Sequence, residues 1–435
     1  MGYPLTLSRL RFVAEGIYVH HVKRRLTSPP PRGLVWVLTY RCDARCTMCG
    51  VWKVRDHREL DLPAIERLAS SALFRGLSYV NLTGGEPTIR KDLPEIARIL
   101  VERLPRLARV TLTTNGLATA RVVGAAERLA EIFGPRGVDF MTSVSVDGVG
   151  ELHDEVRGRQ GAFASVTATL QALRELGIRR GVNLTLSPQN LAGARAAIAW
   201  SRGLGIEPFV IVATVLDTYY HNAEQMGELR TLDKEAAAEL FRELSASPAL
   251  TDFSKIHYHD LSCMLSTGAE RRTPCVFQSD AFFLEPDGGL YPCMHGKRLG
   301  NVLDSASPGL ELDRARDGGG GGGCERVGEE PQGGPALDRG LDGGLELYRG
   351  GREERLRLQR EVCPRCTTSC FVGVGVAQEF FRHLRFVLAR RLGFGNGLPP
   401  RSPQGGAAPA AHERLERGAA DRSRTSSRQR RQKAP

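Results

Sequence analysis

The chain has 435 residues, which is enough for two or three domains with a full hydrophobic core. Its formal net charge is +11, but residues 401–435 hold nine Lys or Arg against three Asp or Glu, so this tail carries +6 and the rest +5. This distribution argues against a nucleic-acid partner, and the composition of the tail predicts disorder. Neither a membrane-spanning apolar run nor an export signal is present, which predicts a cytoplasmic protein.

The N-terminal region, residues 1–30, combines an apolar stripe with basic residues over 5–25 and then runs into a proline-rich spacer. A second segment of this kind covers 380–392, within 373–400. Two interpretations stay open for both segments. They pack against the body of the protein, or they hold it peripherally at the inner face of the membrane through anionic lipid.

Apolar strand patterns alternate with helical patterns from residue 31 to about 225, which is typical of a parallel α/β sheet. The predicted strands are 34–39, 78–83, 109–114, 139–146, 181–186 and 208–213. The predicted helices are 62–72, 93–104, 118–133, 162–176, 190–203 and 233–245. Six such units are too few for a closed eight-stranded barrel. We therefore expect a partial (β/α)6 TIM-like barrel, followed by a linking helical region at 226–262.

Polar residues recur at every second position along four of these strands. They are Asn81, Thr83, Thr111, Thr113, Asn115, Ser143, Ser145, Asp147, Asn183, Thr185 and Ser187. Since residues two apart on a strand share a face, these side chains should form one polar file. The pattern predicts a lumen that holds a polar ligand, whereas a solvated sheet face is the alternative.

Three cysteines, Cys42, Cys46 and Cys49, follow the first predicted strand within eight residues. Such close spacing suits ligands of one inorganic centre better than disulfides. Three thiolates leave one iron of a [4Fe-4S] cluster free for another ligand. A structural zinc loop with a distant fourth ligand is the alternative.

The second predicted strand ends in Thr83-Gly84-Gly85-Glu86-Pro87. Two glycines allow the backbone to approach a ligand, and Glu86 adds a carboxylate at the edge where α/β sheets bind ligands. Further along, Asp217, Tyr219, Tyr220 and His221 follow the sixth strand and are expected at the same edge as possible substrate contacts.

The cysteine spacing and the Gly-Gly-Glu-Pro segment together resemble the radical S-adenosylmethionine (SAM) superfamily. The resemblance implies that Gly84, Gly85, Glu86 and Pro87 hold the SAM amino group. It also makes Ser145 and Asp147 candidates for the SAM ribose, with Asn115 as a lesser one. Arg157, in a stretch with Asp154, Gly158, Gly161 and Phe163, meets the SAM carboxylate or forms a surface salt bridge. Met48 stands where the family often has an aromatic residue.

Cysteines return near the C-terminus, beyond the linking region. They are Cys263, Cys275, Cys293, Cys324, Cys363, Cys366 and Cys370. The segment from Asp287 to Val302 is predicted to form a hairpin. Residues 263–372 resemble the SPASM or twitch domains that carry auxiliary clusters. Cys275, Cys293, Cys363, Cys366 and Cys370 offer five thiols, enough for one auxiliary [4Fe-4S] cluster, with zinc as the alternative.

The segment 308–352 interrupts this small cysteine-rich domain and is predicted to be a flexible insertion, so that its Cys324 is no ligand. The resemblance as a whole implies an enzyme that cleaves SAM reductively to a 5′-deoxyadenosyl radical and abstracts a hydrogen atom from a peptide or small-molecule substrate. It also implies a flavodoxin- or ferredoxin-like reductant. A non-enzymatic iron–sulfur electron carrier and a zinc-binding interaction protein are the alternatives.

Overall fold

The computed structural model describes residues 30–273, 275–278, 280–303 and 343–367. Several predicted features lie outside these residues: the basic segments 5–25 and 380–392, the tail 401–435, most of the insertion 308–352, Cys324 and Cys370. Within the described part, no helix has the length and apolar content that crossing a bilayer requires.

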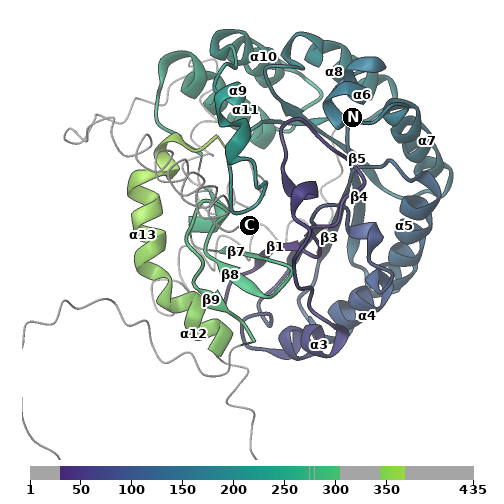
Figure 1. The fold of residues 1–435 in the computed structure, drawn as a ribbon, viewed down its shortest axis with the longest axis vertical. Coiled ribbons are helices and arrows are strands. Elements are labelled where there is room, and N and C mark those ends of the chain that lie inside the picture. Colours follow the sequence, from purple (N-terminus) through teal and green to yellow (C-terminus); the bar gives the residue numbers. More distant parts are fainter. Residues whose placement is uncertain (1–29, 274, 279, 304–342, 368–435) are drawn as a thin grey trace, which may run out of the picture.

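Parallel strands alternate with helices and form an open barrel with the helices outside it (Figure 1). The strands are β1 (Gly33–Val37), β2 (Tyr79–Thr83), β3 (Arg109–Thr114), β4 (Asp139–Ser145), β5 (Arg180–Leu186) and β6 (Phe209–Val212). The main helices are α3 (Leu62–Ser70), α4 (Leu93–Arg103), α5 (Thr119–Phe133), α7 (Ala162–Glu175), α8 (Ala194–Gly203) and α10 (Lys234–Ala246). The predicted α/β partial barrel is confirmed, and only the start of α8 differs from prediction by more than two residues.

The two faces of the barrel sheet differ in polarity. Leu82, Leu112 and Val144 lie on the outer face and are fully buried in the core beneath the helices. Asn81 and Thr113 lie half-buried on the opposite face, where the Thr113 hydroxyl donates to Asn81 Oδ1 over 2.9 Å. The predicted polar file is therefore present on the inner face.

Side-chain caps mark the starts of helices α3 and α10. The Asp61 carboxylate accepts a hydrogen bond from the Ala64 N–H at the start of α3, and Asp233 does the same for Ala236 in α10. Such caps satisfy backbone donors that have no partner within the helix. They allow each amphipathic helix to begin where its apolar face meets the sheet.

The barrel sheet continues into the cysteine-rich region, which the sequence had not indicated. Strand β7 (Ala281–Leu284) pairs in parallel with β1 and extends through the hairpin of β8 (Gly289–Tyr291) and β9 (Gly300–Asn301). The predicted antiparallel pairing within Asp287–Val302 is present as β8 and β9, and Gly288 takes a positive φ of 89° in the turn between β7 and β8. The described strands thus form one nine-stranded sheet rather than a barrel beside a separate small domain.

Two predicted boundaries also need correction. Cys263, expected at the start of the small domain, lies inside helix α11 (Asp252–Thr267). The predicted insertion ends too late, because helix α12 (Gly343–Gly350) falls within it and buries Leu345 and Tyr348 in the core. These two apolar residues are only three positions apart and flanked by glycines, which is too short a pattern to reveal a helix. Helix α13 (Arg352–Glu361) then leads to the distal cysteines.

A buried ion pair joins the starts of β1 and β7. Arg32 donates through Nε and Nη2 to Asp280 Oδ2 over 2.8 and 2.6 Å, and both side chains are nearly inaccessible to solvent. The Asp280 carbonyl also accepts hydrogen bonds from the N–H groups of Arg32 and Gly33. These contacts fix the register in which the C-terminal strands join the barrel.

Replacing Asp280 by Asn should lower the free energy of unfolding by about 3 kcal/mol or more, because it leaves a buried guanidinium without its counter-charge. Denaturant unfolding monitored by circular dichroism measures this loss. The matched control is Glu95→Gln, which breaks an exposed Arg98–Glu95 pair and should cost less than about 1 kcal/mol. Equal stability of the two variants would contradict the structural role of the buried pair.

Candidate functional site

The cysteine loop, residues 42–49, lies beyond the C-terminal end of β1. Its backbone is held by the end of helix α6 (Glu151–Arg157), since the N–H groups of Arg45 and Thr47 donate to the carbonyls of Arg157 and Val156, each over 3.0 Å. All three cysteines are partly buried. The structure therefore places the predicted ligands together at the edge of the sheet where α/β folds bind ligands.

The electrostatics of the loop disfavour bare thiolates. The pKa of Cys42 and that of Cys49 are each raised to about 12, mainly by burial and in part by the neighbouring Cys46. A bound metal reverses this preference, because coordination deprotonates a thiol outright. Three clustered thiols are soft donors of the kind that iron–sulfur centres use, so the donor set fits an iron–sulfur cluster.

Gly84 and Gly85 pack directly against the segment that leads into the cysteine loop. A Cβ atom on Gly85 would lie 2.4 Å from the Arg41 carbonyl oxygen, and one on Gly84 would lie 2.4 Å from that of Thr39. The Gly85 and Glu86 N–H groups donate to the Thr39 and Arg41 carbonyls, each over 2.8 Å. Glycine is thus required at both positions, because a side chain would clash with the backbone of residues 39–41.

The Glu86 carboxylate is held by hydrogen bonds within the chain, and its contact with SAM stays a prediction. The side chain is fully buried, with hydrogen bonds from the N–H groups of Thr88 and Asn115 at 3.2 and 2.7 Å. The hydroxyls of Thr88 and Thr114 also donate to it. Burial raises its pKa, although these hydrogen bonds oppose the shift. Glu86 therefore ties the end of β2 to the end of β3.

Asn115 and Asp147 are also engaged within the chain. The Asn115 amide donates to Asp43 Oδ1 over 2.7 Å and its nitrogen lies 3.8 Å from Cys42 Sγ. Asp147 forms a buried ion pair with Arg157, with 2.7 Å between Oδ2 and Nη2, which corrects the alternative of a surface salt bridge for Arg157. Ser145, by contrast, lies half-buried on the inner face.

The loop after β6 covers the cysteine loop from the other side. The Gly50 N–H donates to the Tyr220 carbonyl over 2.7 Å, and a Cβ on Gly50 would lie 1.9 Å from the His221 carbonyl oxygen. His221 takes a φ of 48°, the one positive value among the described residues other than glycine. The predicted location of residues 217–221 at the rim is thus correct.

Asn222, which the sequence analysis did not single out, anchors this covering loop. Its buried amide donates to the Met48 carbonyl over 2.9 Å and to that of Thr214 over 3.1 Å, while its oxygen accepts from the Leu216 N–H. The amide therefore joins the cysteine loop to the end of β6. A lone Asn in a loop carries no pattern from which this contact could be predicted.

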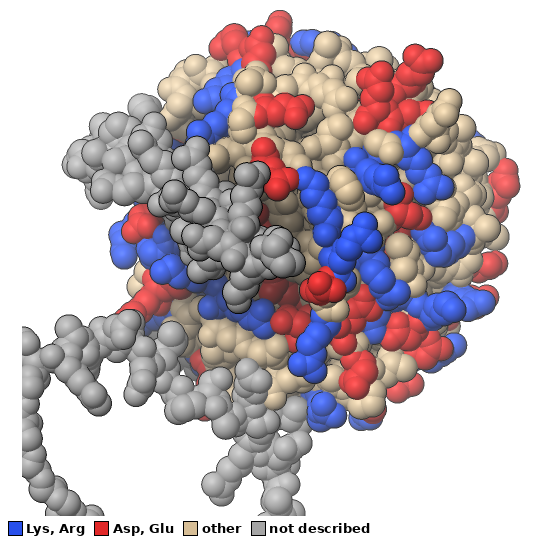
Figure 2. Space-filling model, in the orientation of Figure 1, with Lys and Arg blue, Asp and Glu red and all other residues tan. Residues whose placement is uncertain are grey.

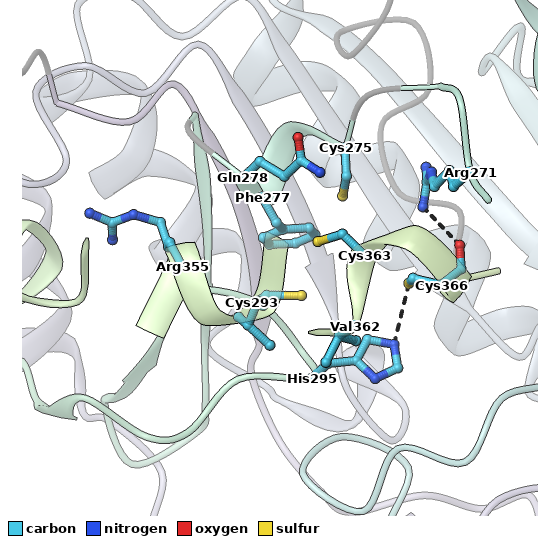
Figure 3. A pocket seen from close by; sticks show the side chains of 11 residues that line it. Arg271, Cys275, Phe277, Gln278, Cys293, His295, Arg355, Val362, Cys363 and Cys366 are labelled. Carbon is cyan, nitrogen blue, oxygen red and sulfur yellow. Dashed lines mark hydrogen bonds between the residues drawn. The ribbon is translucent and has the colours of Figure 1, made fainter. Parts of the chain in front are cut away.

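The C-terminal cysteines Cys275, Cys293, Cys363 and Cys366 line one cavity (Figure 3). They come from both ends of the described C-terminal region. Burial raises the pKa values of Cys275, Cys293 and Cys363 above the ordinary value of a thiol. His295 lies among them, with Nε2 3.5 Å from Cys366 Sγ, and was missed although it stands two residues after Cys293. In the described ranges, no group of three or more His, Cys, Asp or Glu side chains is arranged so that it could hold one metal ion.

One buried carboxylate connects the two cysteine regions. Glu285 accepts hydrogen bonds from the hydroxyls of Tyr40 and Tyr291 over 2.9 and 3.0 Å. Tyr40 stands two residues before Cys42, and Tyr291 stands two residues before Cys293. The two cysteine regions are therefore linked through this carboxylate by hydrogen bonds.

A cationic hollow of about 430 Å³ opens beside the cysteine loop, and Cys42 forms part of its wall. Three exposed cations line it: Arg41, Arg45 and Arg55. The Arg45 guanidinium lies 5.9 Å from the centre of the Trp52 ring. Lys and Arg side chains also gather near the centre of the face shown in Figure 2. An anionic partner would be attracted to the loop from this side.

Replacing Glu86 by Gln should lower the free energy of unfolding by about 1–3 kcal/mol, because an NH2 group would face backbone donors that then lose their acceptor. Thermal unfolding of the ligand-free chain measures this effect, with Glu95→Gln as the exposed control. If Glu86→Gln instead unfolds like the wild type and binds SAM more weakly, the main role of Glu86 is contact with the ligand.

The comparisons with known proteins support the interpretation of the cysteine loop. A model of the Radical SAM superfamily matches residues 36–200. Fe-coproporphyrin III synthase of Methanosarcina barkeri is 32% identical over 160 residues, which cover 36% of this chain and 38% of that protein. GTP 3′,8-cyclase of Rhodopseudomonas palustris is 32% identical over 243 residues, which cover 53% of this chain and 65% of that protein. The match thus spans less than two thirds of either relative.

The fold is also shared with a solved structure. Native anSMEcpe with bound AdoMet and Kp18Cys peptide superposes with a TM-score of 0.51 at 15% identity, covering 85% of this chain and 100% of that one. This likeness concerns the fold alone. Residues 36–200, which include the cysteine loop, are those that match the Radical SAM superfamily.

Proposed function

We propose that the chain is a radical SAM enzyme in which Cys42, Cys46 and Cys49 hold a [4Fe-4S] cluster. The observation that carries the proposal is the convergence of these three thiols at the C-terminal edge of a barrel with a polar inner face. When bound, such a cluster delivers the electron that cleaves SAM to methionine and a 5′-deoxyadenosyl radical, which abstracts a hydrogen atom from the substrate. The residues of the chain orient the cofactor and exclude water.

For SAM itself, we propose contacts from the segment Gly84–Pro87, Asn115 and Ser145. Ser145 has a half-buried hydroxyl on the inner face, and Gly84–Pro87 and Asn115 lie at its rim, next to the cysteine loop. Asp147 was a candidate for the SAM ribose, and Arg157 for the SAM carboxylate or a salt bridge; the two form an ion pair with each other. Arg157 also donates to Cys46 Sγ over 3.4 Å, which supports a role at the cluster.

We propose that Cys275, Cys293, Cys363 and Cys366 hold an auxiliary iron–sulfur cluster. Four thiols lining one cavity meet the ligand number of such a cluster. Two further side chains are alternative ligands, each in place of one of these four thiols. They are Cys370, the fifth thiol considered from the sequence, and His295. Zinc bound by the same thiols is the competing assignment.

The proposed substrate is a peptide or a small polar molecule. Asn81 and Thr113 line the inner face, so a substrate with hydrogen-bonding groups can replace their contacts with water. The solved neighbour anSMEcpe carries a peptide, and GTP 3′,8-cyclase is named for a small molecule. Both classes are compatible with an open barrel.

The proposed electron donor is an acidic flavodoxin- or ferredoxin-like protein that docks at the cationic hollow. Arg41, Arg45 and Arg55 lie on the wall that Cys42 shares, so a partner bound there approaches the cluster closely. Complementary charge increases the rate of such encounters and makes them dependent on salt. The membrane contact considered from the sequence rests on segments outside the described residues.

Replacing Cys42, Cys46 or Cys49 by Ala should abolish production of 5′-deoxyadenosine, since two protein thiolates do not hold the cluster in its SAM-binding form. Anaerobic reconstitution followed by iron, sulfide and zinc analysis and a SAM cleavage assay measures the effect. Cys263→Ser, on helix α11 and not among the residues that line either cavity, is the control and should behave as wild type. Undiminished cleavage by any loop variant would remove the proposal.

The same experiment separates the two cysteine groups. Replacing Cys275 or Cys293 by Ala should lower iron to the amount of one cluster, because the auxiliary group loses a ligand, while the loop cluster stays. Stoichiometric zinc that disappears in these variants, with iron unchanged, would assign the auxiliary site to zinc.

Charge reversal at Arg45 and Arg55, each to Glu, should slow reduction of the cluster by reduced flavodoxin about tenfold at low ionic strength, and the difference should shrink with added salt. Stopped-flow absorbance measures the rate. Arg67→Glu, an exposed cation on α3, is the matched control. Equal slowing by the control would place the docking surface elsewhere.

A further inference from the structure

Arg157 is buried at the end of helix α6, between a carboxylate and a cluster ligand. Its Nη2 atom lies 2.7 Å from Asp147 Oδ2, and Nη1 donates to Cys46 Sγ over 3.4 Å. Its Nε atom is buried with no hydrogen-bond partner within the described residues. The guanidinium is therefore directed at the thiol from a fixed position rather than exposed to solvent.

Several contacts lock this geometry. Asp147 accepts a hydrogen bond from the Thr185 N–H of β5 over 2.8 Å, and its own N–H donates to His153 over 3.0 Å. Asn190 donates to the Asp147 carbonyl over 2.9 Å. The carboxylate that orients Arg157 is thus held by strand β5, and the backbone of Asp147 is held by helix α6 and the loop after β5.

Gly158 brings the cysteine loop against the same helix end. It has a φ of 62°, and a Cβ atom there would lie 2.4 Å from the Arg45 carbonyl oxygen. Because Arg45 also donates its N–H to the Arg157 carbonyl, the guanidinium and the thiol of Cys46 are fixed relative to each other.

A buried ion pair is a weak source of stability, since desolvation offsets most of the attraction between its charges. A cation that donates to a thiolate, in contrast, stabilises negative charge on that sulfur in a medium of low dielectric. Hydrogen bonds to the sulfurs and local charge are among the factors that set the potential of an iron–sulfur cluster.

We infer that Arg157, oriented by Asp147, is a positioning residue that donates to the Cys46 thiolate and raises the reduction potential of the cluster. The inference rests on the proposed function, because it needs a cluster on the loop. Reduction adds an electron and no proton, so the added negative charge is stabilised by the guanidinium. Removing the donor makes reduction harder, whereas removing the charge of Asp147 makes it easier.

The test is a redox titration of the reconstituted protein without SAM, followed by electron paramagnetic resonance of the reduced cluster. Arg157→Gln should lower the equilibrium constant for reduction about tenfold, which corresponds to about 59 mV for one electron. Asp147→Asn should shift it in the opposite direction. Arg157→Lys, which keeps the charge without the forked donors, should lie between Arg157→Gln and wild type.

The matched control is Arg174→Gln, which removes an exposed cation at the end of helix α7 and should leave the potential unchanged because solvent and salt screen it. The iron content of every sample is measured, so that potentials are compared only between proteins that contain the cluster. A wild-type potential in loaded Arg157→Gln would overturn the inference, as would loss of SAM affinity without any shift in potential. Failure of the proposed function is distinguishable, because the wild-type loop would then hold no cluster.

Discussion

Strand β1 is the element on which both cysteine regions depend, because it pairs in parallel with β2 on one side and β7 on the other. Its C-terminal end leads into Tyr40 and the cysteine loop, while β7 and β8 bring Glu285 and Tyr291 alongside. The Arg32–Asp280 pair fixes this arrangement at the opposite ends of the strands. A single sheet register therefore sets the relative position of the cysteine loop and the proposed auxiliary site.

Buried acids organise the rim around the loop. Glu86 joins the ends of β2 and β3 through its hydrogen bonds, and Asp147 joins β5 to the end of α6 through Thr185 and Arg157. Carboxylates in these positions fix the backbone segments that approach the loop. The cysteine loop is thereby surrounded by buried carboxylates that hydrogen bonds hold in place.

The strands and the helices around the barrel could be predicted from the local periodicity of their apolar residues. The cysteine loop could be predicted from the spacing of its three cysteines. The polar file followed from the two-residue repeat of strands, as the contact between Thr113 and Asn81 shows. The roles of Glu86 and Arg157 could not be predicted, since they depend on partners 28 and 111 residues away. The pairing of β7 with β1 and the short helix α12 were missed for the same reason: long-range packing decides both.

The central claim is that the cysteine loop holds a cluster with one iron open to SAM. The most direct measurement is the electron paramagnetic resonance spectrum of the anaerobically reconstituted, reduced protein before and after addition of SAM. A cluster held by Cys42, Cys46 and Cys49 has an iron without a protein thiolate, so SAM should change the spectrum in wild type and in Cys275→Ala alike. An iron–sulfur spectrum that SAM leaves unchanged, or a reconstituted protein that binds zinc and no iron, would contradict the account.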